Sequence, residues 1–141
     1  MIYWCWKNKI PMIIPGPTDA SVGTQFWMVY QEDKDFKLNL FLDEQKLSDI
    51  VFEAKKTGAL LLGGGISKHH TIWWNQFRGG LDYAVQITTA HETDGSLSGA
   101  ETREAISWGK LTEQAKHVTI HADLTTILPL MIKALKERLN K

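Results

Sequence analysis

The sequence predicts an α/β fold with a mostly parallel sheet, because short apolar runs alternate with segments of helical periodicity along the chain. The clearest strand is the continuous apolar run at residues 59–62, which is typical of a parallel strand covered on both faces. Three glycines and then a helical pattern follow this run. We therefore expect ligands to bind in the loops after the carboxyl ends of the strands.

The N-terminal part of the chain is expected to alternate helix and strand. Pro15-Gly16-Pro17 ends the first strand, because its two prolines forbid a helix. Asp43 is suited to cap a later helix whose apolar residues recur every three or four positions, and Gly58 is suited to end it. The expected elements are a helix at 2–8, a strand at 9–14, a helix at 21–30, a strand at 36–41 and a helix at 44–57.

The C-terminal part continues the alternation. Ser67 can cap the helix after the glycines, and Asp123 can open a final helix whose apolar residues line one stripe. The expected elements are a strand at 59–62, a helix at 67–77, a strand at 81–88, a helix at 102–115, a strand at 117–122 and a helix from 123 onward.

Composition argues against several functional classes. The 141 residues include 16 basic and 16 acidic side chains, so nothing indicates an electrostatic surface for nucleic acid or membrane. Hydrophobic residues make up 43% and charged residues 23%, which is typical of one soluble domain. We expect a cytoplasmic protein, since no apolar run has membrane-spanning length, no signal-peptide pattern opens the chain and Cys5 has no partner for a disulfide. The six tryptophans suit core packing or subunit interfaces.

Two of the expected loops have the composition of a ligand site. Gly63-Gly64-Gly65 lets the backbone turn sharply and approach a ligand, and a helix N-terminus favours phosphate. The spacing differs from G-x-G-x-x-G, so a plain tight turn is the alternative. The polar segment at residues 88–99 offers hydroxyls, amides and the Asp94 carboxylate for a ribose or an amine, unless it is a solvated loop.

Histidine and lysine side chains supply the candidate chemistry. His69 and His70 are adjacent and do not share a helix face, so we expect no metal site. One imidazole could accept a proton near neutral pH, or could pack locally. Lys110 follows a Trp-Gly pair, and a partly desolvated pocket there would free its amine to form an imine. An exposed lysine without a role is the alternative.

Taken together, these segments resemble the deoxyhypusine synthase family over nearly the whole chain. The stretch from Leu61-Leu62 through the glycines to Lys68-His69-His70 resembles its Gly-Gly-Gly…Lys-His-His segment, and Glu104 through Ser107-Trp108-Gly109-Lys110 resembles a later one. The other similar segments, in order and at matching spacing, are Ile10-Pro11, Pro15, Thr18-Asp19 and Gly23, then Asp82-Tyr83-Ala84-Val85, Thr89-Ala90, Asp94-Gly95-Ser96 and Ser98-Gly99-Ala100.

The resemblance implies an NAD-dependent transferase. In this family, hydride leaves spermidine for NAD, and a lysine amine captures the aminobutyl group as an imine with release of diaminopropane. The group then passes to an acceptor lysine on a translation initiation factor. By match, Lys110 forms the imine, His69 is the base, Glu104 lies at the amine site and Trp108 packs on the aliphatic chain. The positions matching NAD contacts are Asp19, Gly63, Gly64, Gly65, Thr89, Ala90, Asp94, Ser98, Ala122 and Asp123.

The resemblance also implies a Rossmann-like, doubly wound, mostly parallel sheet that is incomplete here. The family is more than twice as long, and this chain matches it from near the middle. We therefore expect residues 1–141 to be the C-terminal portion of an NAD-binding domain without complete NAD sites of its own. It would work in a homo- or hetero-oligomer with a chain that supplies the N-terminal half, unless it is a fragment or a degraded gene product.

Three positions depart from the family's pattern. Thr24 and Leu97 stand where the family carries aspartates that bind the amines of spermidine, and Trp73 replaces an asparagine near the substrate. A buried charge pair of this kind contributes a few kcal/mol to binding. We expect imine chemistry to be kept while the donor or acceptor amine changes. The alternatives are a homospermidine-forming enzyme with putrescine as acceptor, and a truncated, non-catalytic paralogue that assembles with or regulates a full-length partner.

Overall fold

A computed structural model describes residues 1–140 of the chain. The chain divides into two compact units, Met1–Glu53 and Ala54–Lys141, and each is described by itself. Within the described residues, no helix combines the length and the apolar character needed to cross a membrane.

The first unit is helical, and the two strands predicted in it are wrong. Residues 9–14 and 36–39 form no regular element, and residues 40–41 already belong to a helix. Pro11 and Pro15 lack the N–H that a strand ladder needs, while Asn39 Oδ1 accepts a hydrogen bond from Phe41 N at 3.1 Å. The elements are α1 (Ile2–Lys7), the 3-10 turn η1 (Pro17–Asp19), α2 (Ser21–Glu32) and α3 (Leu40–Glu53).

The expected helices of this unit are present with shifted ends. α3 begins four residues before the predicted start and ends at Glu53, so Asp43 lies in its first turn and Gly58 does not end it. Beyond that end, the guanidinium of Arg78 donates to the carbonyl oxygens of Ala54 at 3.2 Å and Lys55 at 3.3 Å. These carbonyls are therefore satisfied outside any helix.

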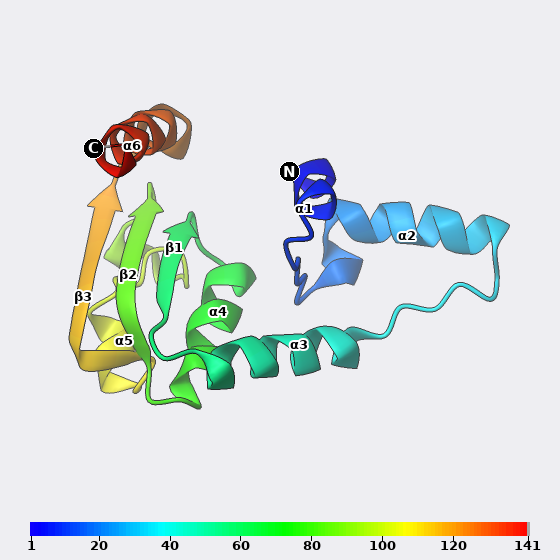
Figure 1. Ribbon diagram of the computed structural model, residues 1–141, viewed down its shortest axis with the longest axis horizontal. Helices are drawn as coiled ribbons and strands as arrows, with labels where there is room; N and C mark the ends of the chain where they lie inside the picture. Colours follow the sequence, from blue (N-terminus) through cyan, green and yellow to red (C-terminus); the bar gives the residue numbers. More distant parts are fainter. Residues whose placement is uncertain (141) are drawn as a thin grey trace. The chain divides into compact units, whose positions relative to one another are not determined.

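The second unit is built on a three-stranded parallel sheet in the order β1-β2-β3, and this confirms the predicted α/β class. Figure 1 shows the three arrows side by side and pointing the same way. The elements are β1 (Gly58–Leu62), α4 (Ile66–Gln76), β2 (Leu81–Thr88), the 3-10 turn η2 (Glu92–Asp94), α5 (Glu104–Ser107), β3 (Leu111–His121) and α6 (Leu124–Leu139).

The long helix predicted at residues 102–115 is wrong. α5 is a single turn, and Gly109 after it adopts φ +65°, which ends the helix. The chain then enters β3, where Leu111 pairs with Leu81, so this strand begins six residues earlier than predicted. Ser67 also does not cap α4, whose N-cap is Gly65, whereas Asp123 caps α6 as predicted.

The core of the second unit lies between one face of the sheet and the helices α4 and α5. Its buried residues are Leu61, Ile72, Leu81, Ala84, Ala105 and Leu111.

On the opposite face of the sheet, apolar side chains are exposed. Leu60 is 48% exposed, and Leu62, Tyr83 and Val118 are exposed to a similar degree. Side chains alternate across a strand, so these four residues share one side, here called the open sheet face. A parallel sheet is normally covered on both faces, whereas the open sheet face is covered only in part: Ile87, which pairs with Leu62 on the same side, is fully buried.

Candidate active site

The glycine turn lies where β1 ends and α4 begins. Gly63 and Gly65 adopt φ +81° and +74°, and a Cβ on either would meet no atom of the described residues within 4 Å. Gly64 differs, since a Cβ there would lie 2.4 Å from Ser98 Cα. Gly64 thus packs against the segment after β2, while its two neighbours border open space.

The positions matched to NAD in this unit cluster at one edge of the sheet. Gly63 follows β1, Thr89 and Ala90 follow β2, and Ala122 follows β3, all at the carboxyl ends of adjacent parallel strands. A dinucleotide binds at such an edge, and the open space beside Gly63 and Gly65 leaves room for a phosphate. The residues present therefore fit one part of an NAD site.

The acidic residues of the NAD set have other contacts. Asp94 Oδ2 accepts from His91 N at 2.9 Å, and Asp123 Oδ1 accepts from Thr126 N at 3.0 Å. The Thr125 hydroxyl, followed by the Thr126 donors, lowers the pKa of Asp123. Both carboxylates thus brace local backbone. Asp19 belongs to the first unit, where it is exposed in η1.

The four residues matched to catalysis and substrate binding line one cavity of about 300 Å³. Lys110 Nζ lies 5.9 Å from the ring centroid of Trp108, an indole that is 69% exposed. Leu97 and Trp73 both depart from the family's pattern. Leu97 lines the same cavity, whereas Trp73 stacks with His69 at a ring-centroid distance of 6.4 Å. The lining residues are Lys68, His69, Ile72, Leu97, Ala100, Glu101, Glu104, Ala105, Trp108 and Lys110.

Short elements place the reactive side chains of this cavity. The Lys110 N–H donates to Ala105 O at 2.9 Å, and the Lys110 carbonyl accepts from Leu81 N at 3.0 Å. Its main chain is thus fixed between α5 and β2, and its half-buried side chain reaches the cavity. His69 lies in the first turn of α4, where its N–H donates to Gly65 O at 3.1 Å.

The sequence interpretation missed the role of Lys68. This side chain is only 6% exposed, and its Nζ donates to Leu97 O at 2.8 Å and to Ala100 O. Burial lowers the pKa of Lys68, and the nearby Glu104 carboxylate opposes that shift in part. The spacing of Lys68, Ile72 and Asn75 could have revealed its burial, because residues four and three apart share a helix face.

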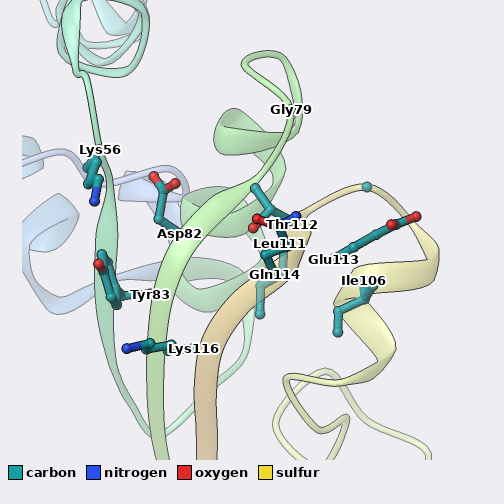
Figure 2. A pocket seen from close by; sticks show the side chains of 11 residues that line it. Lys56, Gly79, Asp82, Tyr83, Ile106, Leu111, Thr112, Glu113, Gln114 and Lys116 are labelled. Atoms are coloured by element: carbon teal, nitrogen blue, oxygen red, sulfur yellow. The ribbon is translucent and has the colours of Figure 1, made fainter.

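A second cavity, of about 670 Å³, lies at the amino ends of β2 and β3 (Figure 2). None of the residues matched to catalysis, substrate or NAD line it. Its Asp82 is already paired, because Oδ2 accepts from Thr57 N at 2.8 Å and from Arg78 Nη1 at 3.2 Å. The Thr57 N–H and then the Arg78 guanidinium lower the pKa of Asp82. The Asp82 carboxylate in this cavity is therefore part of a structural ion pair with Arg78.

Comparison with known proteins finds similarity to one family over nearly the whole chain. A family model described as deoxyhypusine synthase matches residues 1–135. A probable deoxyhypusine synthase of Picrophilus torridus is 63% identical over 132 residues, which cover 94% of this chain and 42% of that protein. One from Thermoplasma acidophilum is 59% identical, covering 94% and 43%, and one from Sulfolobus acidocaldarius is 55% identical, covering 93% and 42%.

The chain thus spans less than half the length of these relatives. The matched residues nevertheless include those that line the smaller cavity, the glycine turn and the three strands. On this match, the chain belongs to the deoxyhypusine synthase family.

Proposed function

We propose that the chain forms part of an enzyme that moves an aminobutyl group from spermidine, or a related polyamine, to an acceptor lysine of a translation initiation factor. The observation that carries this proposal is the single cavity lined by Lys110, His69, Glu104 and Trp108. The similarity to probable deoxyhypusine synthases supports it.

Each cavity residue has a chemical task in this proposal. NAD, when bound, supplies the hydride acceptor and returns the hydride at the end. His69 takes the proton from the donor nitrogen as the neighbouring carbon loses hydride, which leaves a carbon–nitrogen double bond. The amine of Lys110 attacks that carbon, the bond to the diaminopropane nitrogen breaks, and the aminobutyl group stays on Lys110 as an imine.

One charge of the cavity suits an amine donor. Glu101 and Glu104 line the cavity beside Lys68 and Lys110, and the Glu101 carboxylate already lies 3.2 Å from Arg103 Nε and 3.4 Å from His121 Nε2. Glu104 is therefore the carboxylate that would attract an ammonium group of the polyamine. Trp108 offers an indole surface to methylene groups, and Leu97 adds an apolar side chain. The cavity thus keeps the Glu104 carboxylate for an amine despite the leucine at position 97.

We further propose that the active form is an oligomer in which the N-terminal part of the family domain covers the open sheet face. The support is the exposure of Leu60, Leu62, Tyr83 and Val118, together with the 42% share of the relatives' length that the chain spans. Residues that complete the NAD site would come from that part. The chain alone is then expected to bind NAD weakly, and tight binding by isothermal titration would contradict this.

The test of the reaction is borohydride trapping on Lys110. The chain is coexpressed with the N-terminal part of the Picrophilus torridus relative, and spermidine, NAD and borohydride are added. We expect mass spectrometry to find an aminobutyl adduct on the Lys110 peptide. Lys110→Ala should abolish the adduct, and the exposed-site control Lys55→Ala should retain it.

The possible outcomes separate the alternatives. An adduct with another polyamine but not with spermidine would reject deoxyhypusine synthesis and favour a homospermidine-type transfer. If assembly forms but no amine gives an adduct, the enzyme proposal is wrong. In that case, a non-catalytic assembly subunit becomes the better explanation.

A further inference from the structure

We propose that Lys68 is a positioning residue that fastens residues 97–100 against the glycine turn, joining the substrate cavity to the NAD-binding edge. The functional part of this inference rests on the proposed function, whereas the fastening itself does not. Lys68 is distinct from the imine-forming lysine, although both line the same cavity.

The first support is the surroundings of the ammonium group. Lys68 is 6% exposed, yet its Nζ donates to two main-chain carbonyls, Leu97 O and Ala100 O. These residues lie about thirty positions further along the chain, so the contact is tertiary. A buried ammonium is stable only when it is paired or hydrogen-bonded, and here main-chain carbonyls provide those bonds.

A second buried side chain holds the same loop from the sheet. Gln86 on β2 is fully buried, and its Nε2 donates to Ser98 O at 3.0 Å. Three carbonyls within four consecutive residues are therefore held by side chains from α4 and β2. A loop that is fixed so completely has little freedom to adapt, which suits preorganisation of a site.

The position of the held loop gives Lys68 its significance. Ser98 lies so close to Gly64 that a Cβ on Gly64 would come within 2.4 Å of Ser98 Cα. Leu97 and Ala100, on either side of Ser98, line the cavity that contains Lys110. Lys68 thus holds one short loop that borders the glycine turn and forms part of the cavity wall.

Glu104 supplies the remaining link to the substrate. Its carboxylate lies close enough to Lys68 to act on it electrostatically, and both residues line the cavity. The ammonium of Lys68 therefore also shapes the field that an incoming polyamine meets.

The first experiment measures amide hydrogen exchange in the chain itself. Lys68→Met keeps most of the side-chain length but removes the donors, and Lys55→Met is the exposed control. We expect the amides of Gly99 and Ala100, which donate to Ser96 O, to exchange at least tenfold faster in Lys68→Met. Amides of β2 should accelerate by a smaller factor than the loop amides, and Lys55→Met should match the wild type. Loop exchange within twofold of the wild type would overturn the proposal.

Lys68→Arg covers the case in which Lys68→Met does not fold. The guanidinium can still donate to both carbonyls but differs in shape, so we expect a folded chain with intermediate loop exchange. If the β2 amides and the loop accelerate together in Lys68→Arg as well, the lysine only supports global stability and the positioning role is wrong.

The second experiment uses the coexpressed complex and measures adduct formation on Lys110 against NAD concentration. Lys68→Met should raise the NAD concentration that gives half-maximal adduct formation more than fivefold. The maximal amount of adduct at saturating NAD should fall by a smaller factor. A proportional fall in trapping at every NAD concentration would contradict the positioning role. If even the wild type gives no adduct, the proposed function fails, and the exchange experiment still decides whether Lys68 fastens the loop.

Discussion

A single methyl group at Gly64 should force the loop at Ser98 away from the glycine turn. In Gly64→Ala the new Cβ would lie 2.4 Å from Ser98 Cα, 2.5 Å from its Oγ and 2.7 Å from its Cβ. The first of these atoms is main chain, so no side-chain rotation relieves the clash. The loop must withdraw by about 1 Å to reach an ordinary contact distance.

The energetic consequence follows from the bonds that hold this loop. A withdrawal of about 1 Å would stretch the 3.0 Å bond from Gln86 and the 2.8 Å bond from Lys68 beyond hydrogen-bonding distance. A neutral hydrogen bond contributes about 1 kcal/mol and one from a charged donor about 1.5–3 kcal/mol. Because the loop can relax in part, we expect Gly64→Ala to lower the free energy of unfolding by about 2–4 kcal/mol.

The assay is native-state hydrogen exchange of the β2 amides, which report the opening of the second unit. A loss of about 2–4 kcal/mol corresponds to exchange that is roughly 30- to 700-fold faster. Gly95→Ala is the control for adding a methyl group without a clash, because a Cβ at Gly95 meets no described atom within 4 Å. Gly95 has φ +62°, whereas Gly64 is not a positive-φ glycine, so the control carries a backbone strain that Gly64→Ala does not. That control should cost only about 1 kcal/mol of left-handed strain.

A companion variant separates the two kinds of contact. Ser98→Gly removes the Oγ and Cβ of Ser98 but leaves its Cα in place, so combined with Gly64→Ala it should restore only part of the stability. The reasoning is refuted if Gly64→Ala loses no more than Gly95→Ala, or if Ser98→Gly restores stability fully.

Two further predictions concern the braces of the second unit. Arg78→Lys should lower the free energy of unfolding by about 2 kcal/mol. Arg78 reaches Thr57 Oγ1 and Gly80 O through Nη1 and Ala54 O through Nη2, and the single nitrogen of a lysine cannot occupy both positions. Urea unfolding checks this against the exposed control Arg138→Lys, and equal losses would contradict it. The pKa of Asp123 in the folded chain lies below the ordinary value of a carboxyl group. The ionised Asp123 carboxylate therefore stabilises α6 at pH values above that ordinary pKa, and this stabilisation is lost as the pH falls through the lowered pKa. Far-UV circular dichroism below about pH 4 should therefore show α6 fraying in the wild type, whereas Asp123→Asn should remove this step and keep a cap at neutral pH.

The sequence predicted β1 and β2 well because their signals are local. An apolar run followed by glycines marks the end of β1, and β2 was predicted with its observed bounds, Leu81–Thr88. The resemblance rested on whole segments rather than single residues, and the roles that it implies for the site residues stay predictions. The side chains of Lys110, His69, Glu104 and Trp108 do line one cavity.

The errors arose where structure depends on distant partners. Residues 9–14 and 36–41 have the composition of strands, but a strand needs a neighbour, and the sheet lies in the other unit. The helix predicted through residue 115 failed because Gly109 ends it and Leu111 pairs with β2 instead. The contacts of Lys68 escaped notice because its acceptors are main-chain carbonyls, which leave no signature in the sequence.

The anchoring of the Lys110 main chain has a consequence for the proposed reaction, in which this residue would serve two successive transfers. Its N–H donates to Ala105 O and its carbonyl accepts from Leu81 N, so the position of its Cα is fixed. The four methylene groups between this Cα and the amine can still rotate. In the proposed reaction, a group carried on the amine would therefore move from the donor's position to the acceptor's by side-chain rotation, without movement of a domain. Under the same proposal, a residue of the cavity wall such as Leu97 would select the amines that react, whereas Lys110 would stay the same whichever amines they are.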